Sequence, residues 1–309
     1  MIASLFRKST PFNYTVLIVF VAVFYMLYQF SGSAKENDVA GILEKLFLFG
    51  LIFSALFILN FIVKKNGLSR DNSYAILFYF LFLLFFPSAF DNFNLCVSNF
   101  FILLALRRLV SLQSLKAPKE KIFDASLWIF LAAVFHFWAI IFIVLVFISV
   151  LFHVSRDYRN WILPFIAFIT AIVLFFLFAL LFDETRIAFV ASNLPIDVSI
   201  DYFTDNKQNI ALSLYAPVVA YYVFLMMTTL PNRPLILQSS YKKIIFAFFT
   251  GVGVFIISPF KSNEILIYTF APLAIMASTI VETTSSQLKR EIMTGLTAVL
   301  AILSFFMQL

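Results

Sequence analysis

Long apolar runs fill most of this sequence, and nearly every charged residue lies in the short segments between them. A bilayer core about 30 Å thick is crossed by about 17–25 apolar residues in one helix. Runs of this kind occur at 14–31, 46–63, 73–90, 95–110, 161–182, 211–229, 243–260, 264–281 and 292–308. With 62% apolar and 12% charged residues, the chain cannot cover a globular surface with polar groups, which excludes soluble enzymes and disulfide scaffolds. The pattern predicts an all-α, polytopic bundle that forms one integral membrane domain over 1–309.

The segment 123–155 is too long for one ordinary span and short for two, so loop charge decides its topology. Lys and Arg concentrate in cytoplasmic loops of membrane proteins. If the segment turns near His136, the chain has eleven spans, and the inside segments hold 17 of the 22 Lys and Arg but six of the 16 acids. A single span would place Arg233, Lys242 and Lys243 outside. The charges therefore predict a hairpin at His136, a cytoplasmic N-terminus and a bacterial inner-membrane location, with no nucleic-acid partner.

The basic residues near the predicted inner ends allow two interpretations, one structural and one functional. Arg7 and Lys8 precede a run that is long for a signal peptide, so we expect an uncleaved anchor. The densest basic cluster contains Arg107, Arg108, Lys116, Lys119 and Lys121. Topology determination and contact with anionic lipid are the ordinary interpretation. Binding of a phosphate-bearing cytosolic ligand is the alternative.

The predicted outer face carries polar residues at helix ends and in tight turns. They are Asp91, Asn92, Asn94, Asn99, His136, Lys261 and Glu264, with Asp183, Glu184, Arg186, Asp197, Asp201, Tyr202, Asp205 and Lys207 from the predicted extracytoplasmic loop 183–210. Ionisable groups at membrane depth are costly and tend to be functional. If these turns converge, one cavity holds a histidine, several carboxylates and two or three cations. The loop is long enough for a short interfacial helix or lid.

Each candidate also has an ordinary structural explanation. The His136 ring can rest in an apolar wall at the interface, and Asp91 can cap the helix that follows it. Lys261 and Glu264 are three residues apart and can pair across their turn. The acids of 183–205 can form a solvated loop, in which Arg186 stands out as the lone Arg on the predicted outer side.

Several motifs are missing, and their absence narrows the chemistry. The sequence has no CxxC, HExxH or clustered His for a zinc site, and the single Cys96 forms no internal disulfide. It has no P-loop or GxSxG motif, and its spans lack a ladder of carboxylates for a proton pump. We therefore expect no metal and no cofactor. No pair of glycines at small-xxx-small spacing stands out, so helix contacts should depend on Phe, Leu and Ile.

Three stretches combine a polar outer turn, a helix ending in basic residues and an A-x-x-F-H span. They are Phe86-Pro87-Ser88-Ala89-Phe90-Asp91-Asn92, Asn99-Phe-Phe-Ile-Leu-Leu-Ala-Leu-Arg107-Arg108 and Ala132-Ala133-Val134-Phe135-His136-Phe137-Trp138-Ala139. This arrangement resembles the centre of EpsG- and Wzy-type polysaccharide polymerases. The whole chain also resembles a family of Phe-rich polytopic membrane proteins from Flavobacteria-type Bacteroidota, a resemblance that implies no activity.

The polymerase resemblance implies transfer of a glycan from a polyprenyl-diphosphate carrier at the outer leaflet. A cation, Arg186 or Lys261, would neutralise the departing diphosphate, and Asn92 and Asn99 would bind substrate. His136, Asp91 or Glu264 would be the general base for the acceptor hydroxyl. The expected partners are the bilayer, this glycan carrier and other envelope membrane proteins.

Two other classes of function stay open at this point. The first is a non-enzymatic subunit or scaffold of a cell-envelope secretion, motility or lipopolysaccharide assembly, which needs only shape. The second is a lipid or small-molecule transporter, which is favoured by Pro217 and Pro272 inside spans. Whether the protein is an enzyme is therefore undecided by sequence.

Overall fold

A computed structural model describes residues 2–31, 39–182, 184–199 and 206–309. Every regular element in these ranges is a helix. The α-helices are α1 Ile2–Leu5, α2 Pro11–Ser31, α3 Val39–Lys65, α4 Tyr74–Phe85, α5 Phe93–Val110, α6 Pro118–Phe135, α7 Ile143–His153, α8 Arg159–Phe182, α9 Thr185–Ser192, α10 Asn206–Thr229, α11 Leu235–Ile257, α12 Ile267–Thr283 and α13 Gln287–Gln308. Short 3₁₀ helices are η1 Pro87–Phe90, η2 Ser111–Ser114, η3 Phe137–Phe142, η4 Leu230–Asn232 and η5 Asn263–Leu266.

Eight of the described helices are long and apolar enough to cross a membrane. They are Pro11–Ser31, Gly41–Lys65, Phe93–Ser114, Arg159–Phe182, Asn206–Asn232, Leu235–Ile257, Asn263–Thr283 and Gln287–Gln308. Two shorter apolar helices, Tyr74–Phe85 and Phe137–His153, lie among them. The prediction of an all-α bundle that is an integral membrane protein is confirmed.

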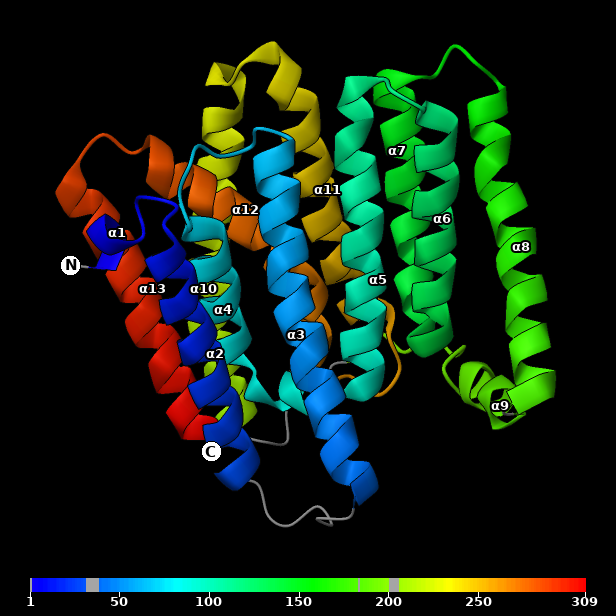
Figure 1. The fold of residues 1–309 in the computed structure, drawn as a ribbon, viewed down its shortest axis with the longest axis horizontal. Coiled ribbons are helices and arrows are strands. Elements are labelled where there is room, and N and C mark those ends of the chain that lie inside the picture. The colour runs from blue at the N-terminus through cyan, green and yellow to red at the C-terminus, as the bar shows by residue number, and fades with distance from the viewer. Residues whose placement is uncertain (1, 32–38, 183, 200–205) are drawn as a thin grey trace.

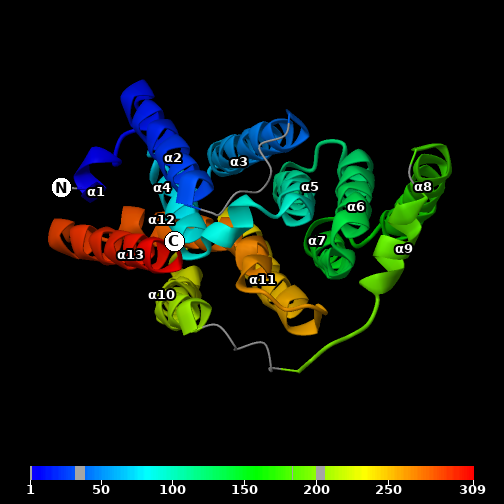
Figure 2. The same ribbon diagram turned by 90° about the horizontal axis from the view of Figure 1, so that it is seen from below.

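The bundle has a tightly packed centre and a loosely attached edge. Helices α4 and α12 lie in the middle, surrounded by α2, α3, α10, α11 and α13 (Figures 1 and 2). All residues of α4 are buried, as is 94% of the apolar window that contains α12. In contrast, α8 lies at the far edge beside α6, and 17% of its window is buried. The apolar side chains that α8 exposes are therefore suited to contact lipid.

One close helix contact depends on a glycine, which the sequence did not lead us to expect. A Cβ atom on Gly251 of α11 would lie 3.1 Å from the carbonyl carbon of Tyr268 and from Cγ2 of Thr269 in α12. A hydrogen at this position lets the two backbones approach. The expectation that helix contacts depend on Phe, Leu and Ile did not include this contact.

The chain reverses direction at His136, where loop charge predicted a hairpin. Helix α6 ends at Phe135, and His136 adopts an extended backbone with φ −141° and ψ 103°. The following η3 and α7 run back beside α6 (Figures 1 and 2). The turn therefore presents the His136 side chain at one end of the bundle.

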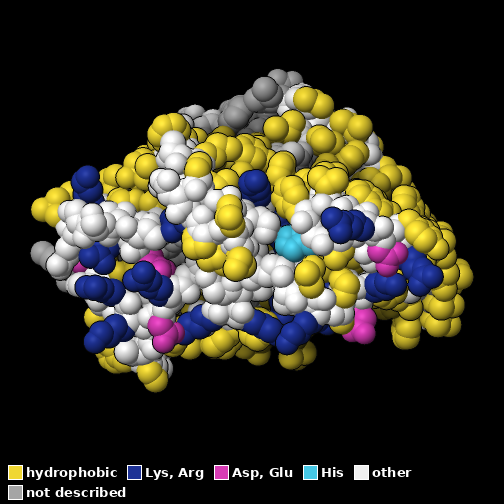
Figure 3. All heavy atoms as spheres, turned by 90° about the horizontal axis from the view of Figure 1, so that it is seen from above, with side chains coloured by type: hydrophobic (Ala, Val, Ile, Leu, Met, Phe, Trp, Pro, Cys, Tyr) yellow, Lys and Arg dark blue, Asp and Glu magenta, His cyan; other side chains and the backbone are white. Residues whose placement is uncertain are grey.

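The two ends of the bundle differ in charge. We call the end at the C-termini of α3 and α5 the basic end, because Lys and Arg gather there (Figure 3). Some of these cations are paired, as in Arg108–Asp124 at 2.7 Å and Lys119–Asp157 at 3.3 Å. The backbone N–H of Arg159, which donates to Asp157, holds the pKa of that carboxyl below its usual range. The turns that contain Asp91, His136 and Lys261 lie at the opposite end.

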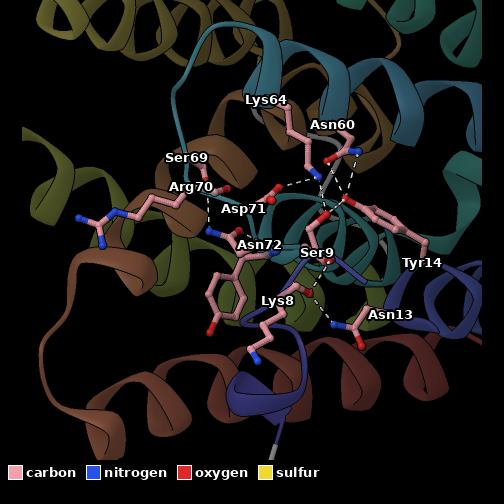
Figure 4. Close-up of polar contacts among 12 residues, drawn as sticks. Lys8, Ser9, Asn13, Tyr14, Asn60, Lys64, Ser69, Arg70, Asp71 and Asn72 are labelled. Carbon is pink, nitrogen blue, oxygen red and sulfur yellow. Dashed lines mark hydrogen bonds and ion pairs between the residues drawn. The ribbon is translucent and has the colours of Figure 1, made fainter. Parts of the chain in front are cut away.

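At the basic end, a polar network fastens the segment before α2 to α3 and to the loop before α4 (Figure 4). The backbone N–H of Ser9 donates to the Asp71 carbonyl at 3.0 Å, and the Asn13 amide donates to the Lys8 carbonyl at 2.6 Å. The Lys64 ammonium contacts both the Ser9 hydroxyl and, at 3.2 Å, the Asp71 carboxylate. The Lys64 ammonium therefore has its partners within the protein.

Candidate functional site

The turn between α4 and α5 meets the turn before α12 at the opposite end. Pro87 begins η1, as suits a residue with a fixed φ and no N–H. Asn92 then caps α5, and its Oδ1 accepts from the Leu95 N–H at 3.1 Å. The Asn92 amide nitrogen donates to Glu264 Oε2 at 2.8 Å. Two segments 172 residues apart in sequence are thus joined through one side chain.

Asp91 lies beside this pair and contacts a third segment. Its Oδ1 accepts from the Gln29 amide at 2.6 Å, which connects the turn to the last part of α2. The possibility that Asp91 caps α5 is wrong, because Asn92 occupies the cap position. Asp91, Asn92 and Glu264 are therefore neighbours. Gln29 joins them as a residue that sequence reasoning missed, because an amide at the end of an apolar run carries no motif.

His136 contacts the end of α11. Its Nε2 lies 2.9 Å from the Ser258 hydroxyl oxygen, and that hydroxyl donates to the Val254 carbonyl at 2.6 Å. Because Ser258 has a single hydroxyl hydrogen, its oxygen accepts from His136. We therefore assign the ring hydrogen of the neutral imidazole to Nε2, which leaves the lone pair on Nδ1. Ser258 was also missed from sequence, where it is one serine among many.

Lys261 takes a partner other than Glu264. Its ammonium contacts the backbone carbonyl of Asp197 and lies 3.8 Å from the Asp197 carboxylate. The Lys261 side chain is 5% exposed, whereas that of Asp197 is 44% exposed. The possibility that Lys261 and Glu264 pair across their turn is therefore wrong. Each side chain instead fastens the turn to a different segment.

The segment 194–199 of the predicted loop lies against the His136 turn and α11. The Trp138 indole donates to the Pro195 carbonyl at 3.3 Å, and the Asp197 N–H donates to the Ile257 carbonyl at 3.2 Å. The Ser199 hydroxyl and N–H donate to Asp197 Oδ1 at 2.6 and 2.8 Å. These two bonds hold the pKa of Asp197 below its usual range. This part of the loop is thus packed on the bundle.

Arg186 comes to the same end from α9, a short helix that follows α8 (Figures 1 and 2). Its Nη1 donates to Asn94 Oδ1 at 3.3 Å. Its guanidinium carbon lies 5.8 Å from the Phe135 ring centroid and 5.7 Å from that of Phe189. Cations are attracted to aromatic faces at such distances. Arg186 therefore links α9 to the first turn of α5 and to the end of α6, next to His136.

An apolar groove of about 130 Å³ lies at the edge of the bundle. It lies between α6, η3 and α8, and Val190 of α9 closes one side. Its lining includes Phe130, Val134, Phe137, Phe168, Phe175 and Val190. Val134 and Val190 are the sequence neighbours of Phe135 and Phe189, whose rings contact Arg186. Arg186 and the groove thus both involve the helices α6 and α9.

Other predicted residues lie elsewhere. Asn99 is buried in α5 and donates to the Tyr79 hydroxyl at 3.0 Å, so the structure does not bring it to the turns. Lys207 lies in the first turn of α10. Asp183, Asp201, Tyr202 and Asp205 lie outside the described residues.

The described residues at this end have the chemistry to contact an anion and to accept a proton. Within 2–31, 39–182, 184–199 and 206–309, no group of three His, Cys, Asp or Glu side chains could hold a metal ion. The chemistry available to the described residues is that of guanidinium, ammonium, imidazole and carboxylate groups. Comparison with family models, with curated proteins and with solved structures finds no match for this chain.

Proposed function

We propose that this protein binds a polyprenyl-diphosphate-linked glycan at the outer leaflet of a bacterial inner membrane and transfers the glycan to an acceptor hydroxyl. The observation that carries the proposal is that Arg186 lies against Phe135, beside His136, at the end of the helix α6 that also lines the apolar groove. Arg186 contacts Phe135, which directly precedes His136, and the groove lies between α6 and α8. The proposal agrees with the resemblance to EpsG- and Wzy-type polymerases.

In this proposal the chain has eleven spans and a cytoplasmic N-terminus. The eight long apolar helices are joined by α4, by α6 and by η3 with α7. The basic end would face the cytoplasm, because Lys and Arg favour that side. The turns at Asp91, His136 and Lys261 would then face the outer leaflet, where polyprenyl-linked glycans are used by such polymerases.

The chemistry follows from the groups at that end. The isoprenoid chain would lie in the apolar groove, and the diphosphate would contact Arg186. The acceptor oxygen would attack the anomeric carbon, and the bond from that carbon to the diphosphate oxygen would break. The acceptor proton would pass to Nδ1 of His136, and Arg186 would offset the charge on the departing diphosphate.

The carboxylates and Lys261 have supporting roles in this proposal. Glu264 and Asp91 accept hydrogen bonds from Asn92 and Gln29, which fix their orientation for binding sugar hydroxyls or for acting as the base. Lys261 would be a second cation for the diphosphate. Its contact with Asp197 also holds the 194–199 segment in place.

Substitution of the two central residues tests the proposal. His136→Ala and Arg186→Gln, expressed in the native host, should each shorten surface glycan chains on a gel. Loss of a positioned proton acceptor slows such reactions by about 10²–10⁴-fold. His153→Ala, at the basic end, removes the chain's other histidine and serves as the matched control. Unchanged glycan in both variants, at equal protein levels in the membrane, would show that the mechanism is wrong.

A second candidate is a non-enzymatic subunit of an envelope assembly. The observation that favours it is the filled centre of the bundle, because α4 and the apolar window of α12 are almost completely buried. This candidate predicts that the His136 and Arg186 variants keep normal glycan. It also predicts that the protein co-purifies with other envelope membrane proteins after gentle detergent extraction.

A further inference from the structure

A second groove, of about 700 Å³, lies at the basic end between α3 and α5. Its lining is Phe57, Ile58, Asn60, Phe61, Lys64 and Lys65 from α3 and Arg107 from α5, and we call it the basic groove. Ligand pockets commonly have volumes of about 300–1,000 Å³. The basic groove is therefore large enough for a lipid headgroup, and it is far from the turns that contain His136.

Two cations of the basic groove are gathered on one aromatic ring. The Arg107 guanidinium carbon lies 4.3 Å from the Phe61 ring centroid, and the Lys65 ammonium lies 4.9 Å from it. In the part of the chain that the structure describes, neither Lys65 nor Arg107 forms an ion pair with an acid. The neighbouring Arg108, in contrast, is paired with Asp124 at 2.7 Å. Lys65 and Arg107 thus form a local excess of positive charge.

The third cation, Lys64, lines the groove, but its charge is already paired within the protein. Its ammonium is directed towards Ser9 and Asp71, as Figure 4 shows. Asn60 is directed towards the Tyr14 hydroxyl, 3.4 Å away. The polar wall of the groove is thus fixed by the network at the start of α2, which leaves Lys65 and Arg107 to meet a ligand.

The other wall of the basic groove is apolar and accessible from the side. Phe57 is 45% exposed and Phe61 is 38% exposed, and both lie on one face of α3 because they are four residues apart. Their rings continue from the cations towards the middle of the span. A ligand that contacts both parts of the groove needs an anionic head and an apolar chain.

We propose that the basic groove binds one anionic phospholipid. The lipid phosphate lies between Lys65 and Arg107, and an acyl chain packs on Phe61 and Phe57. A phosphate accepts hydrogen bonds from a guanidinium in bidentate geometry and from an ammonium as a point charge. Basic pockets between transmembrane helices bind such headgroups. The site is independent of the glycan chemistry proposed for the opposite end.

The test measures lipid retention by the purified full chain in dodecyl maltoside, using native mass spectrometry. The wild-type protein should retain dioleoylphosphatidylglycerol in preference to dioleoylphosphatidylcholine. The double variant Lys65→Gln/Arg107→Gln should bind phosphatidylglycerol about thirtyfold more weakly. Phe61→Leu, which keeps every charge but removes the ring that gathers the two cations, should weaken binding several-fold. Lys116→Gln, which removes an exposed charge outside the groove, should leave it unchanged.

Each result decides for or against the proposal. The proposal would be overturned if Lys116→Gln weakened phosphatidylglycerol binding as much, per charge removed, as the double variant does. Binding would then depend on net charge alone and not on the groove. Competition by sn-glycerol 1-phosphate at the same concentration as the lipid would also overturn it, since the ligand would then be a soluble phosphate compound. Unchanged melting temperatures of the variants show that they are folded. A variant that melts early is replaced by Lys65→Gln alone, which should give about a fivefold loss.

Discussion

The contact between α11 and α12 at Gly251 gives the sharpest prediction about stability. A Cβ atom there would lie 3.1 Å from two atoms of α12 and 3.2 Å from the Tyr268 carbonyl oxygen, whereas carbon atoms pack best at about 3.5–4.0 Å. Two of these three neighbours are backbone atoms, so they cannot rotate away. Gly253, two residues later in the same helix, has no atom within 4 Å of the position that a Cβ would take, and it provides a matched control.

The magnitude follows from the geometry. Overpacking of a tight core contact costs about 1–3 kcal/mol. Helices stay formed in a membrane-like unfolded state. The preference of helices for Ala over Gly is therefore nearly the same in the folded and unfolded states, and it largely cancels from the free energy of unfolding of both variants. We expect Gly251→Ala to lower the free energy of unfolding by about 2 kcal/mol, or about thirtyfold in the equilibrium constant, and Gly253→Ala to leave it nearly unchanged.

The assay is unfolding of the purified protein in dodecyl maltoside by increasing mole fractions of sodium dodecyl sulfate, followed by tryptophan fluorescence. The midpoint for Gly251→Ala should fall below that of Gly253→Ala. Coincident unfolding curves for the two variants would refute the reasoning, because they would mean that α11 and α12 do not approach as closely at Gly251.

Two further predictions concern a buried lysine and the topology. Lys243 is fully buried and donates to the Leu109 carbonyl at 2.6 Å, in the last turn of α5. Lys243→Met, which keeps the volume and removes a buried charge, should change stability by less than about 1 kcal/mol, whereas Lys243→Ala should cost about 2–4 kcal/mol in the same detergent assay. With Cys96→Ser as background, Lys207→Cys should react with an impermeant maleimide in intact spheroplasts and Lys116→Cys should not. Labelling of residue 207 only after the cells are opened would overturn the proposed topology.

The fold was largely predictable because hydropathy and loop charge are one-dimensional properties. The reversal at His136 followed from the charges on either side of 123–155. The run 73–90, in contrast, ends as an α-helix at Phe85 and continues as η1, because the backbone of Phe86 is not helical (φ −136°, ψ 76°) and Pro87 begins a new turn. Apolarity alone cannot detect such a break. Nor could it identify Gly251, since the close contact depends on which face of α11 meets α12.

The arrangement of the candidate site residues was predictable only in part, because their contacts join distant segments. Polar turns identified Asp91, Asn92 and Glu264, but nothing in one sequence indicates that Asn92 donates to Glu264. Sequence reasoning offered Asp91 as the cap of α5, but the cap is the next residue, Asn92. Asp and Asn both favour the cap position, so residue type alone does not choose between them. Lys261 contacts Asp197 because the 194–199 segment folds back onto the bundle, an arrangement that sequence spacing cannot show.

The two parts of the proposed glycan site belong to regions that are packed to different degrees, which makes them separable by mutation. Arg186 and the apolar groove depend on α8 and α9, and 17% of the α8 window is buried. His136 is bound to Ser258 at the end of α11, which packs on the buried centre. If Arg186→Gln loses function but keeps the wild-type melting temperature, the loss therefore reflects weaker binding of the diphosphate, since little of the core depends on α9. His136→Ala removes a contact to α11 as well, so its effect is assigned to proton transfer only if His136→Gln, which can still donate to Ser258, is equally inactive.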